Sequence, residues 1–285
     1  MKQFRMLFRL ITFTVALALG GLLSTALASP PGLLLATTTS LQDSGLLDVL
    51  IPLFEKESGY VVKTVAFGSG QAMKMARKGE VDVLLVHSPE AVNRFMAEGG
   101  GSASQPVMHN EFVVVGPASD PARVRGSRNG IEAFRKIAAG KAPFLSRHDD
   151  SGTHVREMEL WKAAGVSPHD RKWYQRTTGL GMGQTLFVAD ERKAYTLSDR
   201  ATYLALKKKL ELVILLEGNP GLLNSYQVVQ VNAARWPRVN AAGAKAFADF
   251  MASQKTQRVI AGFGMERFGQ PLFVPDAGEK QGEGN

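Results

Sequence analysis

Three short segments of the sequence combine Ser, Thr and Gly with the start of a predicted helix. They are residues 37–40 (TTTS), 68–71 (GSGQ) and 146–153 (SRHDDSGT). The amino end of a helix presents unpaired backbone N–H groups and about half a positive charge, so it attracts anions. Glycine lets the backbone approach a ligand closely, and hydroxyl groups add further hydrogen-bond donors. The three segments together predict a binding site for an anion.

Arg147, in the third segment, indicates an anion that carries several oxygen atoms. Its guanidinium is a planar fork of donors with no acceptor, which suits two oxygens of one anion. The alternative for Arg147 is a salt bridge to Asp149 or Asp150. The alternative for each hydroxyl-rich segment is an ordinary helix cap. Three such segments and an arginine in one chain favour an oxyanion site over three unrelated caps.

Other kinds of site fit these residues less well. Ser151, His154 and Asp149 suggest a hydrolase triad, but no Gly-x-Ser-x-Gly elbow surrounds any serine. His148 and His154 are six residues apart, which is neither a zinc pattern nor one helical face, and the chain has no cysteine. The glycines at 179–183 lack the spacing of a dinucleotide fingerprint and indicate instead a turn and helix start. We therefore expect no catalysis, no cofactor and no metal site.

Composition is that of a soluble globular protein. The 285 residues are 45% hydrophobic and 21% charged, with a formal net charge of +8. Without residues 1–28, which hold three basic residues and no acidic one, the charge falls to +5. A diffuse positive charge helps to attract anions, but no segment interleaves basic and aromatic residues. We therefore expect no nucleic-acid partner.

The amino-terminal residues indicate export. Three basic residues lie within residues 1–9, an uncharged apolar stretch covers 10–23, and Ala-Leu-Ala at 26–28 is a typical cleavage site. The apolar stretch is too short for a good membrane-spanning helix, although an uncleaved anchor is the alternative. With no cysteine, the chain offers no site for a lipid anchor. We expect a signal peptide over 1–28 and a mature protein free in the periplasm.

From residue 33 onward, strand-like and helix-like runs alternate. Apolar runs predict strands at 33–36, 60–67, 81–86, 111–116, 143–145, 173–178, 195–197, 212–216 and 226–231. Helical spacing predicts helices at 43–59, 70–79, 89–99, 131–139, 151–164 and 241–263. This alternation is typical of parallel sheets covered by helices on both faces.

The restart of the alternation after the turn at 117–121 suggests two α/β lobes. Apolar strands near residues 112 and 228 are where the chain would pass between them. The predicted division assigns 29–112 and 229–285 to lobe 1, and 113–228 to lobe 2. A single larger doubly wound domain is the alternative.

Several segments resemble one known family along most of the mature chain. The sequence is similar to the periplasmic tungstate-binding proteins of the TupA family in these segments: 37–40 with 43–47 (DSGLL), 67–72 (FGSGQA), 81–89 (VDVLLVHSP), 110–120, 146–153, 179–186 (GLGMGQTL), 194–200 (AYTLSDR) and 217–220 (EGNP). The resemblance is mildly weaker at His148, where relatives often carry a small residue, and at 227–230, which is more polar than expected.

The resemblance implies a type II-like periplasmic-binding-protein fold, with two parallel-rich sheets flanked by helices and joined by two crossing strands. It also implies that the protein captures tungstate for an ABC importer, acts as a monomer, and has a membrane permease and an ATPase as partners. Carried over by position, the ligand-binding residues of lobe 1 are Thr38, Thr39, Ser40 and Ser69, and those of lobe 2 are Arg147, Ser151, Gly152 and Thr153.

The chemistry of tungstate agrees with these residue types. Tungstate is a fully deprotonated tetrahedral dianion near neutral pH, so it accepts hydrogen bonds and donates none. Molybdate nearly matches it in size and charge, and the sequence leaves that choice open. Phosphate carries a proton near neutral pH and favours a carboxylate acceptor, a role that Asp149 could fill. A relative that binds a protein partner instead of a small ligand is the remaining alternative.

Overall fold

The computed structural model describes residues 30–177 and 179–278. The predicted signal peptide at 1–28 lies outside the described residues. The strands are β1 (Gly32–Thr38), β2 (Val61–Phe67), β3 (Val83–Val86), β4 (Gly101–Gly116), β5 (Phe144–Ser146), β6 (Tyr174–Arg176), β7 (Thr196–Asp199), β8 (Val213–Leu216), β9 (Leu223–Val231) and β10 (Val274–Pro275). The helices are α2 (Thr39–Asp43), α3 (Leu46–Ser58), α4 (Ser69–Ala76), α5 (Pro89–Ala97), α6 (Gly130–Ala139), α7 (Gly152–Ala163), α8 (Met182–Glu191), α9 (Arg200–Leu206), α10 (Ala241–Ala252), α11 (Gln254–Gly262) and α12 (Met265–Phe268).

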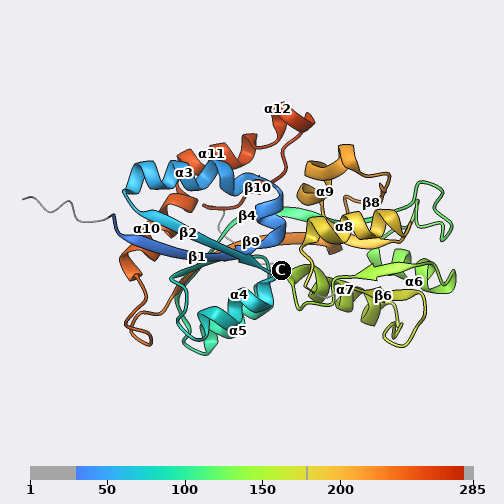
Figure 1. Ribbon diagram of the computed structural model, residues 1–285, viewed down its shortest axis with the longest axis horizontal. Helices are drawn as coiled ribbons and strands as arrows, with labels where there is room; N and C mark the ends of the chain where they lie inside the picture. The colour runs from blue at the N-terminus through green and yellow to red at the C-terminus, as the bar shows by residue number, and fades with distance from the viewer. Residues whose placement is uncertain (1–29, 178, 279–285) are drawn as a thin grey trace, which may run out of the picture. The chain divides into compact units, whose positions relative to one another are not determined.

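Lobe 1 contains the main sheet, in the order β10-β4-β9-β3-β1-β2. Strand β1 pairs in parallel with β2 and β3, so the carboxyl ends of all three lie at one edge. Figure 1 shows α3 and α11 on one side of this sheet and α4 and α5 on the other. Alternate residues of β3 follow the same division: Val83 and Leu85 join one apolar cluster, and Leu84 and Val86 join another.

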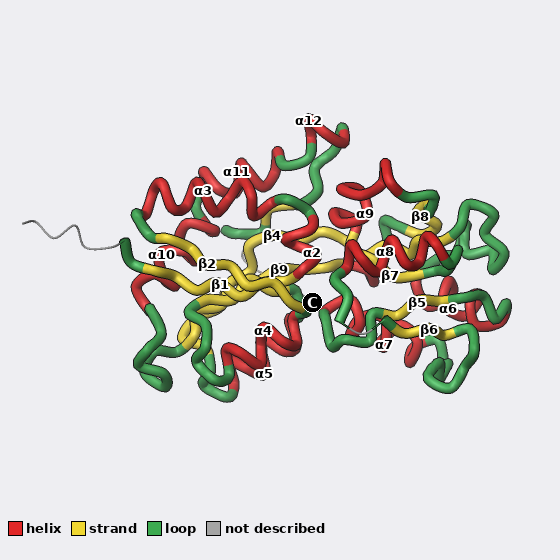
Figure 2. Tube along the Cα trace, viewed as in Figure 1, coloured by secondary structure: helices red, strands yellow, loops and turns green. Residues whose placement is uncertain are grey.

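Lobe 2 is built around β5 and β6, which pair in parallel, and around β7 and β8, which pair with the far end of β4. Its apolar core is rich in aromatic rings: Phe134, Phe144 and Trp161 are fully buried, and their ring centroids lie 4.4–5.4 Å apart. The strands here alternate with helices α6 to α9 (Figure 2). The predicted α/β architecture is thus confirmed.

Strands β4 and β9 connect the two lobes, as the apolar runs near residues 112 and 228 predicted. The boundaries predicted at 112/113 and 228/229 fall inside these strands. The prediction of parallel-rich sheets is wrong, because β9 runs antiparallel to both β3 and β4, and β7, β8 and β10 run antiparallel to β4. The reversal follows from the path of the chain, since β4 leaves lobe 1 and β9 returns to it.

Several elements differ in extent from the prediction. The helix expected at 43–59 is α3, which begins only at Leu46 because Gly45, with a left-handed φ of 82°, separates it from the end of α2 at Asp43. The helix expected at 241–263 is divided at Ser253, whose hydroxyl caps α11 by accepting a hydrogen bond from the Thr256 N–H. Strand β4 begins ten residues before the predicted start at 111. Its first part is polar and contains Pro106, so it lacks the apolar pattern by which strands are predicted. Among the described residues, no helix is both long and apolar enough to cross a membrane.

Candidate functional site

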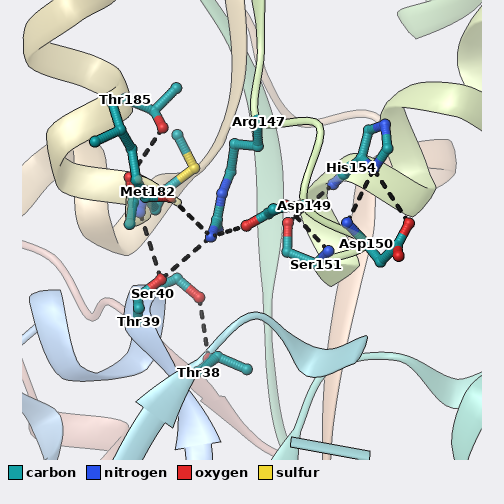
Figure 3. Close-up of polar contacts among 12 residues, drawn as sticks. Thr38, Thr39, Ser40, Arg147, Asp149, Asp150, Ser151, His154, Met182 and Thr185 are labelled. Atoms are coloured by element: carbon teal, nitrogen blue, oxygen red, sulfur yellow. Dashed lines mark hydrogen bonds and ion pairs between the residues drawn. The ribbon is translucent and has the colours of Figure 1, made fainter. Parts of the chain in front are cut away.

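The loops that follow the parallel strands of both lobes meet at one place. In lobe 1, β1 leads directly into α2, and β2 leads through Gly68 into α4. In lobe 2, β5 leads through Arg147 into α7. The carboxyl edges of the two sheets therefore face each other, the usual position of a ligand site in α/β proteins. Figure 3 shows Arg147 of lobe 2 reaching the α2 turn of lobe 1.

Arg147 lies at the centre of this arrangement and is only 3% exposed. Its Nη2 donates hydrogen bonds to the Asp149 carboxylate at 2.5 Å, to Thr39 Oγ1 at 3.4 Å and to the Leu180 carbonyl at 3.5 Å. The salt bridge that the sequence offered as an alternative is therefore present, with Asp149 as the partner. It coexists with the contact to lobe 1, so Arg147 bridges the two lobes through Thr39.

The amino ends of α4 and α7 also meet. The Gly70 N–H donates to the Asp150 carbonyl at 3.2 Å, which joins α4 of lobe 1 to the Arg147 loop. A Cβ at Gly68 would lie 3.0 Å from the Ser151 Cβ, so this close approach favours glycine. Ser151 caps α7 by accepting from the His154 N–H, and its own N–H donates to Asp149. Two helix amino ends therefore direct their partial positive charge at the same region.

Three of the predicted ligand residues hold buried polar atoms without a hydrogen-bond partner among the described residues. They are Ser69 Oγ, Thr153 Oγ1 and Arg147 Nε. Ser69 and Thr153 are each 1% exposed. Eight side-chain atoms of the described residues share this condition, and three of them belong to the predicted ligand residues. Buried polar groups are normally paired, and unpaired donors of this kind are what an anionic ligand would satisfy.

The three hydroxyl residues of the α2 turn have different surroundings. Thr38 Oγ1 and Ser40 Oγ lie 3.1 Å apart and bond each other, and Ser40 Oγ also bonds His87 Nε2 at 3.2 Å. Thr39 is the one that contacts Arg147, and its Oγ1 also accepts from the Met182 N–H at 3.4 Å. The structure therefore brings Thr39 to the Arg147 side chain, while the hydroxyls of Thr38 and Ser40 are used inside lobe 1.

Helix α8 supplies a further amino end from lobe 2. A Cβ at Gly181 would lie 3.3 Å from the Thr39 Cβ, and the Gly183 N–H donates to the Asp43 carboxylate at 2.9 Å. This fits the expectation that the glycines at 179–183 mark a turn and helix start. The nearby hydroxyls of Thr185, Thr196 and Ser198 donate to backbone carbonyls, so they serve the local structure.

A cavity of about 580 Å³ opens beside Arg147. Polar residues outside the predicted ligand set line it, among them Gln42, Gln71 and Gln184. Asp43 and Asp149 also line it, so the walls are not composed of donors alone. Burial raises the pKa of Asp43, against the opposing effect of the Gly183 N–H and the Arg147 charge. Gly68, Thr39 and Gly181 complete the junction of the lobes here.

Histidines surround the Arg147 loop on its other side. The Asp150 N–H donates to His154 Nδ1 at 3.1 Å, and the His148 and His154 rings lie 5.3 Å apart. Burial, followed by the nearby charge of His148, lowers the pKa of His154. Within the described ranges, no group of three or more His, Asp or Glu side chains is arranged to hold a metal ion.

Comparisons with known proteins find matches to periplasmic-binding-protein domains and to tungstate-binding proteins. A family model described as a PBP superfamily domain matches residues 25–255. The tungstate-binding protein TupA of Peptoclostridium acidaminophilum is 44% identical over 283 residues, covering 95% of this chain and 98% of that protein. A solved structure described as the tungstate ABC transporter from Geobacter sulfurreducens is 43% identical with a TM-score of 0.74, covering 81% of this chain and 98% of that one. TupA from Desulfovibrio alaskensis G20 is 44% identical with a TM-score of 0.73, covering 87% and 99%. These matches confirm the predicted two-lobed periplasmic-binding-protein fold.

Proposed function

This chain belongs to the TupA family of tungstate-binding proteins, and from that membership we propose that it captures tungstate between its lobes for delivery to an ABC importer. The observation that carries the proposal is the contact of Arg147 with Thr39 across the lobes, in a protein whose Ser69 and Thr153 hydroxyls are also buried without a hydrogen-bond partner among the described residues. These are donors from both lobes, and a dianion with four acceptor oxygens would satisfy them together.

Helix amino ends and neutral donors, more than the charge of Arg147, would attract a fully deprotonated ligand. The Asp149 carboxylate cancels much of the Arg147 charge, because the two groups are 2.5 Å apart. The attraction for a dianion would then depend on the amino ends of α4, α7 and α8, and on hydroxyl and amide donors. Charge-assisted hydrogen bonds contribute roughly 1.5–3 kcal/mol each. Six or seven would sum to about 9–21 kcal/mol, and the upper part of this range exceeds the roughly 12 kcal/mol of nanomolar binding, which leaves room for desolvation and closure.

Molybdate and phosphate are the second candidates. Molybdate would use the same donors as tungstate. Phosphate has one specific observation in its favour, which is the Asp149 carboxylate beside the cavity. A protonated phosphate could donate to that carboxylate, whereas tungstate has no hydrogen to offer. Asp149 is already bonded by Arg147 Nη2 and by the Ser151 N–H, and this engagement favours a supporting role for it.

The remaining features of the proposal follow from the family. We place the protein in the periplasm, exported by a signal peptide at 1–28, with a membrane permease and an ATPase as its partners. It would act as a monomer and as a binding protein, with no catalytic role. The ligand would enter between lobe 1 (29–112 and 229–285) and lobe 2 (113–228), with β4 and β9 serving as the hinge.

Calorimetric titration of the purified mature chain tests this proposal. Tungstate, molybdate, sulfate and phosphate are titrated separately under one buffer condition. We expect tungstate to bind most tightly, molybdate to bind, and phosphate and sulfate to give no measurable heat at micromolar concentration. Phosphate binding as tight as tungstate would transfer the function to phosphate. No binding of any oxyanion, together with no thermal stabilisation by tungstate, would reject an oxyanion-binding function.

A further inference from the structure

A buried polar network lies beneath the α2 turn and centres on His87. His87 follows β3 directly and is 3% exposed. Its Nδ1 lies 2.8 Å from Asn224 Oδ1 on β9, and its Nε2 lies 3.2 Å from Ser40 Oγ on α2. Asn224 in turn donates through Nδ2 to Asn110 Oδ1 on β4 at 2.7 Å. The network thus connects both crossing strands to the turn that carries Thr39.

These partners favour one tautomer of the His87 ring. The Asn224 amide nitrogen is occupied by Asn110 and Tyr226, so the oxygen of Asn224 faces His87 and can only accept. This arrangement assigns the proton of His87 to Nδ1, so that Nε2 accepts from the Ser40 hydroxyl. Burial lowers the pKa of His87 to about 4, with the Arg147 charge also lowering it and Asp149 opposing. The ring is neutral at physiological pH, and this donor–acceptor pattern is stable.

His87 also lies against the amino end of α7 in lobe 2. A Cβ at Gly152 would lie 2.5 Å from the His87 carbonyl oxygen and 2.7 Å from His87 Nδ1. Gly152 is the first residue of α7, immediately before Thr153. Any side chain at position 152 would therefore push the amino end of α7 away from β3. His87, Gly152 and Asn224 line a second cavity of about 250 Å³, so this contact forms part of the junction between the lobes.

We propose that His87 is a positioning residue for oxyanion binding. Its ring holds the α2 turn of lobe 1 through Ser40, and its backbone and ring together set how closely the α7 amino end of lobe 2 can approach through Gly152. His87 would thereby set the separation of the ligand donors on α2 and α7 when the two lobes are in contact, and it would act without touching the ligand. This inference rests on the proposed function.

Substitution of Gly152 tests the approach of α7. Gly152→Ala adds one methyl group at the contact, and Gly262→Ala is the matched control, because a Cβ there meets nothing within 4 Å. The added methyl group would overpack the contact between His87 and α7 and so hinder closure on the ligand. We therefore expect the tungstate Kd of Gly152→Ala to rise by about 5- to 100-fold. The control should change Kd by less than about twofold, since it leaves the packing intact. A Gly152→Ala variant that binds as tightly as the control would overturn the closure contact.

Two substitutions of His87 separate positioning from simple packing. His87→Gln can keep an acceptor near the place of Nε2, whereas His87→Leu keeps the bulk and removes the acceptor. We expect Gln to stay within about threefold of the wild-type tungstate Kd and Leu to weaken binding by about tenfold, the effect of one lost hydrogen bond. If Leu binds as well as Gln, His87 only fills space and the inference is wrong.

A spectroscopic measurement keeps the inference testable even where a variant fails to fold. Nitrogen-15 NMR of the wild-type imidazole distinguishes the two tautomers, and we expect protonation at Nδ1 with an unprotonated Nε2. The opposite tautomer would contradict the network. If the wild-type protein fails to bind tungstate, that result counts against the proposed function alone, because the tautomer and the network do not depend on the ligand.

Discussion

Removal of the Arg147 side chain is the sharpest test of the proposed site. Arg147→Ala deletes a guanidinium that is 3% exposed and that reaches both lobes. If two charge-assisted hydrogen bonds to the ligand are lost at about 1.5–3 kcal/mol each, the total is about 3–6 kcal/mol. This corresponds to a rise in the tungstate Kd of about 10²- to 10⁴-fold. The Asp149 carboxylate would also lose its counter-charge and repel the dianion, so we expect the upper part of this range.

The assay is calorimetric titration with tungstate, together with thermal unfolding in its presence and absence. Arg77→Ala is the matched control, because it removes the same charge from a surface pair with Glu98 at 3.0 Å. Exposed charges are largely screened, so we expect the control to change Kd by less than about twofold. Arg147→Ala combined with Asp149→Asn should recover part of the affinity by removing the uncompensated carboxylate. Equal Kd values for Arg147→Ala and Arg77→Ala would refute the reasoning.

Three further predictions follow from the same structure. Ser69→Ala and Thr153→Ala should each weaken tungstate binding by about 3- to 10-fold. Ligand-free stability should stay unchanged or rise, because each substitution deletes a buried hydroxyl that has no hydrogen-bond partner among the described residues. A loss of ligand-free stability with an unchanged Kd would mean that these hydroxyls stabilise the fold and do not bind the ligand. Burial raises the pKa of Glu157 to about 7. Protonated Glu157 therefore stabilises the folded state below about pH 4.5, and this contribution is lost as the pH rises through 7. The free energy of unfolding should fall by about 3 kcal/mol over this range. Glu157→Gln should remove that decline in urea unfolding measured at several pH values, and parallel curves for the two proteins would contradict it. Small-angle scattering should show a smaller radius of gyration with saturating tungstate than without it, and identical curves would argue against lobe closure.

The sequence was informative wherever a local signal marked the site. The hydroxyl-rich turns and Arg147 could be identified because each lies where a strand ends and a helix begins, a pattern contained within a few residues. The structure indeed brings Thr39, Gly68, Arg147 and Ser151 together from both lobes. The crossing strands were also located, because their apolar ends form continuous runs.

Features that depend on distant pairing could not be predicted. His87 and Asn224 are 137 residues apart, and nothing in either segment indicates that they bond. Three hydroxyl residues follow one another at 38–40, and only the turn from β1 into α2 decides that Thr39 reaches Arg147. The choice of Asp149 as the salt-bridge partner was equally undetermined. The direction of β9 depends on the return of the chain to lobe 1, which periodicity does not encode.

Strand β4 contributes to two apolar cores at once. Val113 and Val115 pack into the cluster that also contains the β1 and α3 residues of lobe 1, whereas Phe112 and Val114 pack into the aromatic core of lobe 2. Loss of either core would expose alternate side chains of the same strand. The two lobes are therefore expected to melt in a single cooperative transition.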